Sequence, residues 1–241
     1  MIRPLIHRAL SREDLHRLVA EIARLDRAEA RAAEQAIQAG DVDAVLDSPA
    51  ALEAVRGHGG TPAAVALTLL WYVPVRAALC ARGVADVELA DYAASVPVVF
   101  ATRRAVVSVA RGETGIAVWW RHVASLPDGS MAQAEGAADV AALALWWAGC
   151  FPERITRRAG VGVLEAYVTF AAQALRLAAR ILAANGAGSL CARAADQAEA
   201  LYAALADTRQ DYLGRDAHSP EGRLARYLAR LDPGSKRMPL N

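Results

Sequence analysis

The chain has 241 residues, a mass of 25.5 kDa and a formal net charge of +1. With 27 basic and 26 acidic residues, its overall charge excludes attraction of nucleic acid or an anionic membrane by a global positive field. Alanine accounts for 57 residues, and the larger apolar residues that remain are enough for a packed core, which excludes a disordered chain.

The N-terminus and the cysteines indicate a cytoplasmic protein. The first eight residues contain no apolar stretch and no small-residue cleavage site, so we expect no secretory signal. The three cysteines, Cys80, Cys150 and Cys191, lie far apart in mostly apolar segments, and we expect buried free thiols in a reducing compartment. The apolar run from Ala63 to Val75 is too short to span a membrane, so we expect no membrane contact.

The first predicted element is an amphipathic helix from Ser11 to Gln38. Ser11 can cap this helix, and large apolar residues recur at helical spacing along one face until Gly40 ends it. Two short helical turns and a loop follow, and Ser48-Pro49 starts the second of these turns. We expect residues 1–60 to form a helical arm that packs on a core of residues 61–231.

The most apolar predicted helix runs from Thr61 to Arg82. Because it is apolar on nearly every side, we expect it to be the central helix, kinked where Pro74 removes a backbone hydrogen bond. A short turn at Gly83 leads to a helix that starts near Val87. The two helices are therefore predicted to be antiparallel neighbours.

The segment 105–120 is compatible with two different secondary structures. Its β-branched residues would suit a short β-hairpin, whereas a helix from about Thr114 to Ser125 is preferred because the rest of the chain is helical. Further helices are predicted over 132–150, 160–184, 189–212 and 219–231, followed by a flexible tail over 232–241. The fold class is therefore all-α, a single compact helical domain of about seven to nine helices.

The helix at 160–184 has a strong amphipathic pattern. Its apolar residues recur along one face, and the opposite face carries Glu165, Thr169, Arg176 and Arg180. A face of this kind is expected to point to solvent.

The sequence carries no motif of known catalytic or metal-binding chemistry. It has no phosphate-binding loop, no metal-ligand spacing and no activated nucleophile, so we expect no cofactor and favour a protein that is not an enzyme. The basic groups at 103–104 and 154–158 are better explained as solvated helix ends than as a nucleic-acid surface.

Two tryptophan pairs, Trp119-Trp120 and Trp146-Trp147, are the most informative aromatic residues. Adjacent side chains on a helix point about 100° apart, so one ring of each pair is expected in the core. For the other ring two roles are open. The preferred one is that the ring fills core space left by the small alanine side chains, and the alternative is that it lines a pocket or an interface, where tryptophan is enriched.

Arg76 and Asp91 are isolated charges within apolar segments. Counted from the turn between their helices, they lie at similar heights, which predicts a buried ion pair completed by a tyrosine hydroxyl. The pair is either a structural contact or one wall of a small-molecule pocket in which Arg76 binds an anion. The residues of such a pocket would be Tyr72, Arg76, Asp91, Tyr92, Trp146 and Trp147.

Three short motifs carry a family resemblance. They are Tyr72-x-x-Val75-Arg76, Leu89-Ala90-Asp91-Tyr92 and Phe151-Pro152-x-x-Ile155. With the Arg82-Gly83 turn, this pattern resembles that of an uncharacterised bacterial all-α family, over about residues 65–180. Pro97 departs from the family's pattern. The resemblance implies a helical fold and no particular activity.

Three functions are compatible with these observations. The preferred one is a cytoplasmic helical interaction protein that acts through protein–protein contacts with a partner or with itself as a homo-oligomer. The alternatives are a small-molecule-binding protein or metal-independent enzyme with a pocket around Arg76 and Asp91, and, least favoured, a nucleic-acid-binding regulator.

Overall fold

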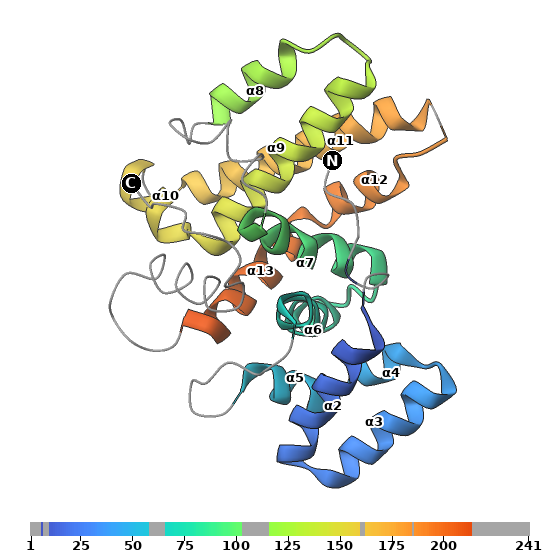
Figure 1. Cartoon of the computed structure of the whole chain (residues 1–241). Coiled ribbons are helices and arrows are strands. Elements are labelled where there is room, and N and C mark those ends of the chain that lie inside the picture. Colours follow the sequence, from blue (N-terminus) through green and yellow to red (C-terminus); the bar gives the residue numbers. More distant parts are fainter. Residues whose placement is uncertain are drawn as a thin grey trace.

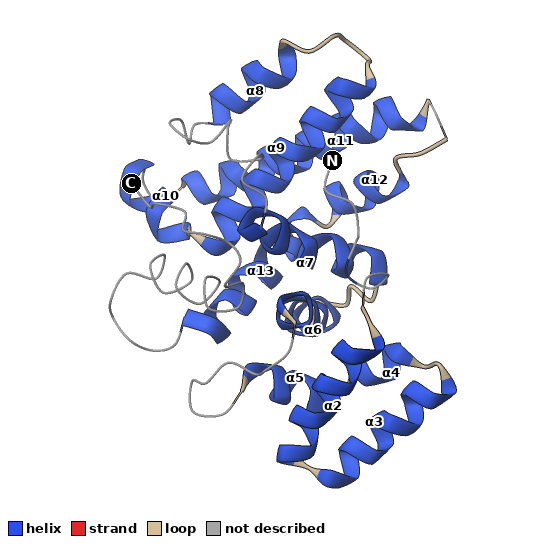
Figure 2. Cartoon of the chain, viewed as in Figure 1, coloured by secondary structure: helices blue, strands red, loops and turns tan. Residues whose placement is uncertain are grey.

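The structure is a computed structural model that describes residues 6, 10–57, 66–102, 116–159, 162–184 and 186–213. Every regular element in these ranges is a helix, which confirms the all-α prediction (Figure 2). The described residues form twelve helices: α2 (Arg12–Leu25), α3 (Arg27–Ala39), α4 (Val42–Leu46), α5 (Pro49–Arg56), α6 (Leu67–Cys80), α7 (Val87–Thr102), α8 (Ile116–Ala124), α9 (Met131–Cys150), α10 (Pro152–Ala159), α11 (Val163–Ala183), α12 (Ser189–Asp196) and α13 (Ala198–Leu213).

The prediction of seven to nine helices was wrong because two predicted helices are broken. Asp26 is extended and caps α3, since its side chain accepts hydrogen bonds from the backbone N–H groups of Ala28 and Glu29. Gln197 leaves helical geometry between α12 and α13. A further helix, α10, was not predicted; Pro152 takes its first helical position.

The β-hairpin considered for 105–120 is not supported where it can be examined. Residues 116–120, its second strand, belong to α8, and residues 103–115 lie outside the described residues. The helix predicted over 219–231 and the tail over 232–241 also lie outside them.

The helices pack around α6, α7 and α9, which are apolar on most sides. α9 packs along α11 on one side and on α13 on the other, and α13 in turn packs on α6 and α7 (Figure 1). Of the 20 residues of α9, 14 are buried, so α9 is as central as α6, which was the predicted central helix. α6 and α7 lie side by side, and each contains an internal proline, Pro74 and Pro97.

Helices α2 to α5 pack on one another at one end of the molecule, and α5 contacts both α6 and α13 of the remaining helices (Figure 1). α5 packs on α6, and Arg56 at the end of α5 lies 3.1 Å from the carboxylate of Asp211 on α13. The capping predictions in this region are confirmed: Ser11 forms a capping box with Asp14, and Ser48 caps α5. Among the described residues, no helix is both long and apolar enough to cross a membrane.

Candidate functional site

The six residues predicted to line one pocket lie in three separate places. Tyr72 and Arg76 on α6 face α4, and the charge of Asp91 on α7 lies near enough to Tyr72 to contribute to its raised pKa. Tyr92 on α7 lies near α12, and the two tryptophans lie at the end of α9. Trp146 stacks on Phe100, which is nine residues beyond Asp91 on α7, or about 13 Å along the helix axis. These side chains therefore do not form the predicted pocket.

Arg76 is held by two carboxylates at the short helix α4: Asp43 lies within the helix, and Asp47 follows its last residue. Its side chain is only 8% exposed, and Nε and Nη2 donate to the two oxygens of Asp47, the second contact at 2.5 Å. Nη2 also lies 4.0 Å from Asp43, and Nη1 donates to the Tyr72 hydroxyl at 3.3 Å. The hydrogen bonds with Asp47 raise the pKa of Arg76, and burial raises the pKa of Tyr72 to about 12.

The predicted ion pair between Arg76 and Asp91 was therefore wrong. The carboxylate of Asp91, which is 3% exposed, accepts the backbone N–H of Ile6 at 2.8 Å and the hydroxyl of Ser95 at 3.2 Å. Both charges are buried and hydrogen-bonded, as expected, but each uses a partner from the N-terminal part of the chain. Because two N–H groups of Arg76 already bind Asp47, the arrangement favours a structural contact over an anion-binding site.

Tyr92 lies near Cys191 of α12 and Asp139 of α9. Its hydroxyl has no hydrogen-bond partner among the described residues, and burial raises its pKa, with the nearby Cys191 and Asp139 adding to the effect. At the end of α9, Trp146 and Trp147 both contact Phe151, and the guanidinium of Arg154 lies 4.9 Å from the centre of the Trp147 ring.

The prediction that one ring of each tryptophan pair is buried is confirmed for the pair on α8. Trp119 is fully buried and meets Tyr167 edge to face at 5.7 Å, whereas Trp120 is 41% exposed. The Trp120 ring packs edge to face on Phe170 of α11, with 5.8 Å between ring centres. Trp120 is one of two large apolar side chains that are exposed among the described residues; the other is Met131.

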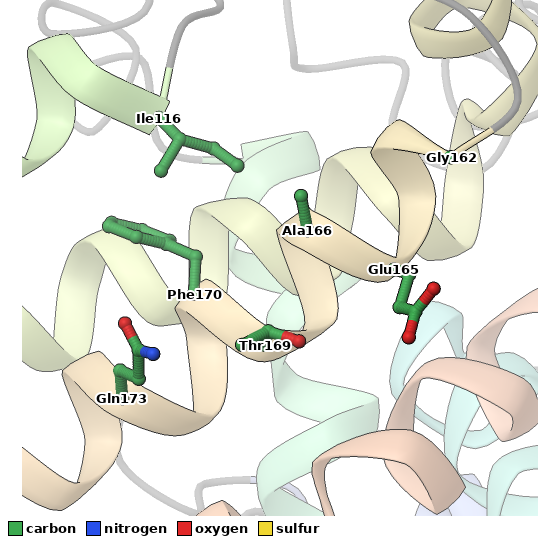
Figure 3. A pocket seen from close by; sticks show the side chains of 7 residues that line it. All are labelled: Ile116, Gly162, Glu165, Ala166, Thr169, Phe170 and Gln173. Atoms are coloured by element: carbon green, nitrogen blue, oxygen red, sulfur yellow. The ribbon is translucent and has the colours of Figure 1, made fainter.

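A groove of about 440 Å³ lies between the start of α8 and the outer face of α11 (Figure 3). Its lining combines an apolar part on the α8 side with a polar edge along α11. Ile116 lies over Phe170, and Glu165 points away from Ile116 (Figure 3). The lining residues are Ile116, Gly162, Glu165, Ala166, Thr169, Phe170 and Gln173.

The sequence predicted no site at this groove, although it placed Glu165 and Thr169 on the polar face of the helix at 160–184. Ile116 and Phe170 could not be brought together from the sequence, because the contact between α8 and α11 joins segments about 50 residues apart. Asp43 and Asp47 were also missed, although carboxylates four residues apart share one side of a helix.

The thiols and carboxylates do not form a metal centre in the described part of the chain. No group of three or more histidine, cysteine, aspartate or glutamate side chains is placed there to hold a metal ion. Cys150 and Cys191 are buried as predicted, and burial raises the pKa of both thiols. The prediction was wrong for Cys80, which is exposed at the last position of α6.

No protein-family model, curated protein or solved structure matches this chain.

Proposed function

We propose that the protein is an interaction protein that acts through protein–protein contacts, and that its contact surface is the groove between α8 and α11 together with Trp120. The exposed Trp120 ring is the observation that carries the proposal. Tryptophan is enriched among the residues that contribute most to protein–protein binding, especially where it is surrounded by polar groups. Here Trp120 contacts Phe170 of the groove, and Glu165, Thr169 and Gln173 give that groove its polar edge.

The shape of the groove favours a protein partner over a small molecule. Small-molecule sites usually enclose most of the ligand surface. Here the polar lining residues are themselves exposed on the outer face of α11, so a small ligand would remain largely in water. The resemblance to a bacterial helical family implies no activity, so the proposal depends on this geometry.

The proposal can be tested by placing a photo-reactive amino acid at position 120. Irradiation in cells is expected to produce a covalent adduct heavier than the 25.5 kDa chain. Position 131 provides the matched control, because Met131 is also exposed but lies outside the lining of the groove. A chain that forms no adduct specific to position 120, and that is also a strict monomer by light scattering, would contradict the proposal.

A further inference from the structure

The outer face of α11 is open to solvent over most of its length. Apart from the adjacent pair Glu165 and Ala166, its exposed residues follow one another at spacings of three and four, so they share one side of the helix. Together they form the α11 stripe, which consists of Gly162, Glu165, Ala166, Thr169, Gln173, Arg176 and Arg180. The first five also line the groove described above.

Charge is distributed unevenly along the α11 stripe. Glu165 is the acidic residue, near the N-terminal end, whereas Arg176 and Arg180 are the basic residues, toward the C-terminal end. The positions between them are Ala166, Thr169 and Gln173, which carry no charge. Arg176 is 57% exposed and lies 3.7 Å from Asp196, which is itself 71% exposed, so this local contact leaves the guanidinium open to solvent.

A face with opposite charges at its two ends is complementary to itself when it is turned around. We propose that the occupant of the groove is a second copy of this chain, with the two α11 helices antiparallel across a two-fold axis near residue 171. This inference rests on the proposed function. In this arrangement Glu165 faces Arg176 of the partner subunit, and Thr169 faces Gln173 of the partner subunit. Two-fold contacts of this kind, in which one patch meets itself, are the commonest in homo-oligomers.

The arrangement also accounts for the exposed ring. Trp120 packs on Phe170, which lies one residue from the axis, so the Trp120 rings of both copies come to the same side of the contact near its centre. Gly162 and Ala166 are small enough to let the two helices approach closely. Parallel packing is disfavoured, because it would place Glu165 beside Glu165 of the partner subunit and the arginines beside one another.

Charge exchange tests the pairing. We expect Glu165→Arg and Arg176→Glu each to weaken dimerisation, measured by sedimentation equilibrium, by roughly tenfold, because each creates two like-charge contacts per dimer. The double variant restores opposite charges and should recover most of the wild-type affinity. Glu34→Arg on the exposed side of α3 is the matched control and should have no effect. Dimerisation of both single variants with wild-type affinity, or no recovery in the double variant, would overturn the proposed pairing.

Cross-linking tests the orientation independently of charge. In a Cys80→Ser background, a cysteine at Thr169 would lie about 6 Å along the axis from its symmetry mate, whereas a cysteine at Ala166 would lie about 15 Å away. A short bifunctional maleimide should therefore join chains at position 169 and not at 166. Equal cross-linking at both positions, or none at either, would overturn the antiparallel dimer. An adduct between position 120 and a different protein would overturn it too, while leaving the proposed function in place.

Discussion

Breaking the contact between α4 and α6 should show which partner of a buried ion pair matters more for stability. We expect Asp47→Ala to lower the free energy of unfolding by about 2–3 kcal/mol, because it leaves the Arg76 guanidinium, only 8% exposed, without its main hydrogen-bond acceptor. The value lies below that of a fully buried pair, since Asp47 is 40% exposed and Asp43 remains 4.0 Å from the guanidinium.

The reverse substitution should cost less. Arg76→Met keeps an apolar stem of similar length and removes the buried charge, and the two carboxylates left behind, 47% and 40% exposed, can be hydrated. We expect a loss of about 1 kcal/mol or less. Arg17→Met is the surface control: its partner Glu13 is 72% exposed, so the loss should be below about 0.5 kcal/mol.

Urea denaturation followed by far-UV circular dichroism measures all three variants, with the free energy taken from the midpoint and the slope. The predicted order of destabilisation is Asp47→Ala, then Arg76→Met, then Arg17→Met. The reasoning would be refuted if Arg76→Met were the most destabilising of the three, or if Asp47→Ala cost no more than the surface control.

The remaining predictions concern packing and thiol chemistry. Gly149→Ala should destabilise the fold by about 1–3 kcal/mol in urea, because the added Cβ would lie 2.7 Å from Leu205 Cβ between α9 and α13. Gly136→Ala should be neutral or stabilising by up to about 1 kcal/mol, because its close neighbour is the movable end of a leucine side chain; a loss equal to that of Gly149→Ala would contradict this difference. In the native protein, a thiol reagent should modify Cys80 rapidly and react with the other two cysteines only after unfolding. Fast modification of more than one thiol in the native protein would contradict the burial of the other two cysteines. The two protected cysteines are Cys150 and Cys191.

Helix positions were predictable where the signals are local. Ser11 and Ser48-Pro49 each start a helix as expected, because a cap and the N–H groups it binds lie within three residues of each other. The apolar and polar faces of α11 were also predicted correctly. The breaks at Asp26 and Gln197 were missed, since each interrupts an apolar pattern that continues on both sides and could equally belong to one long helix.

The candidate site was predictable only in part. The rule that adjacent tryptophans diverge placed one ring of the α8 pair in the core, and the structure identified it as Trp119. The buried guanidinium of Arg76 was expected to need a carboxylate, and it has one. The partner was assigned incorrectly, because nothing within the apolar helices indicates that α4, some 29 residues earlier, packs over Arg76.

The sequence by itself determined the all-α class, most helix starts, the polar face of α11 and the need of each buried charge for a partner. These properties depend on side chains within one or two helical turns, or on the cost of removing a charge from water wherever it is buried. Tertiary packing alone decided which partner each charge meets: Arg76 binds Asp47, and Asp91 binds the backbone of Ile6, 85 residues away. The groove between α8 and α11 belongs to the same class of property, because it exists only where two helices distant in the chain leave a surface between them.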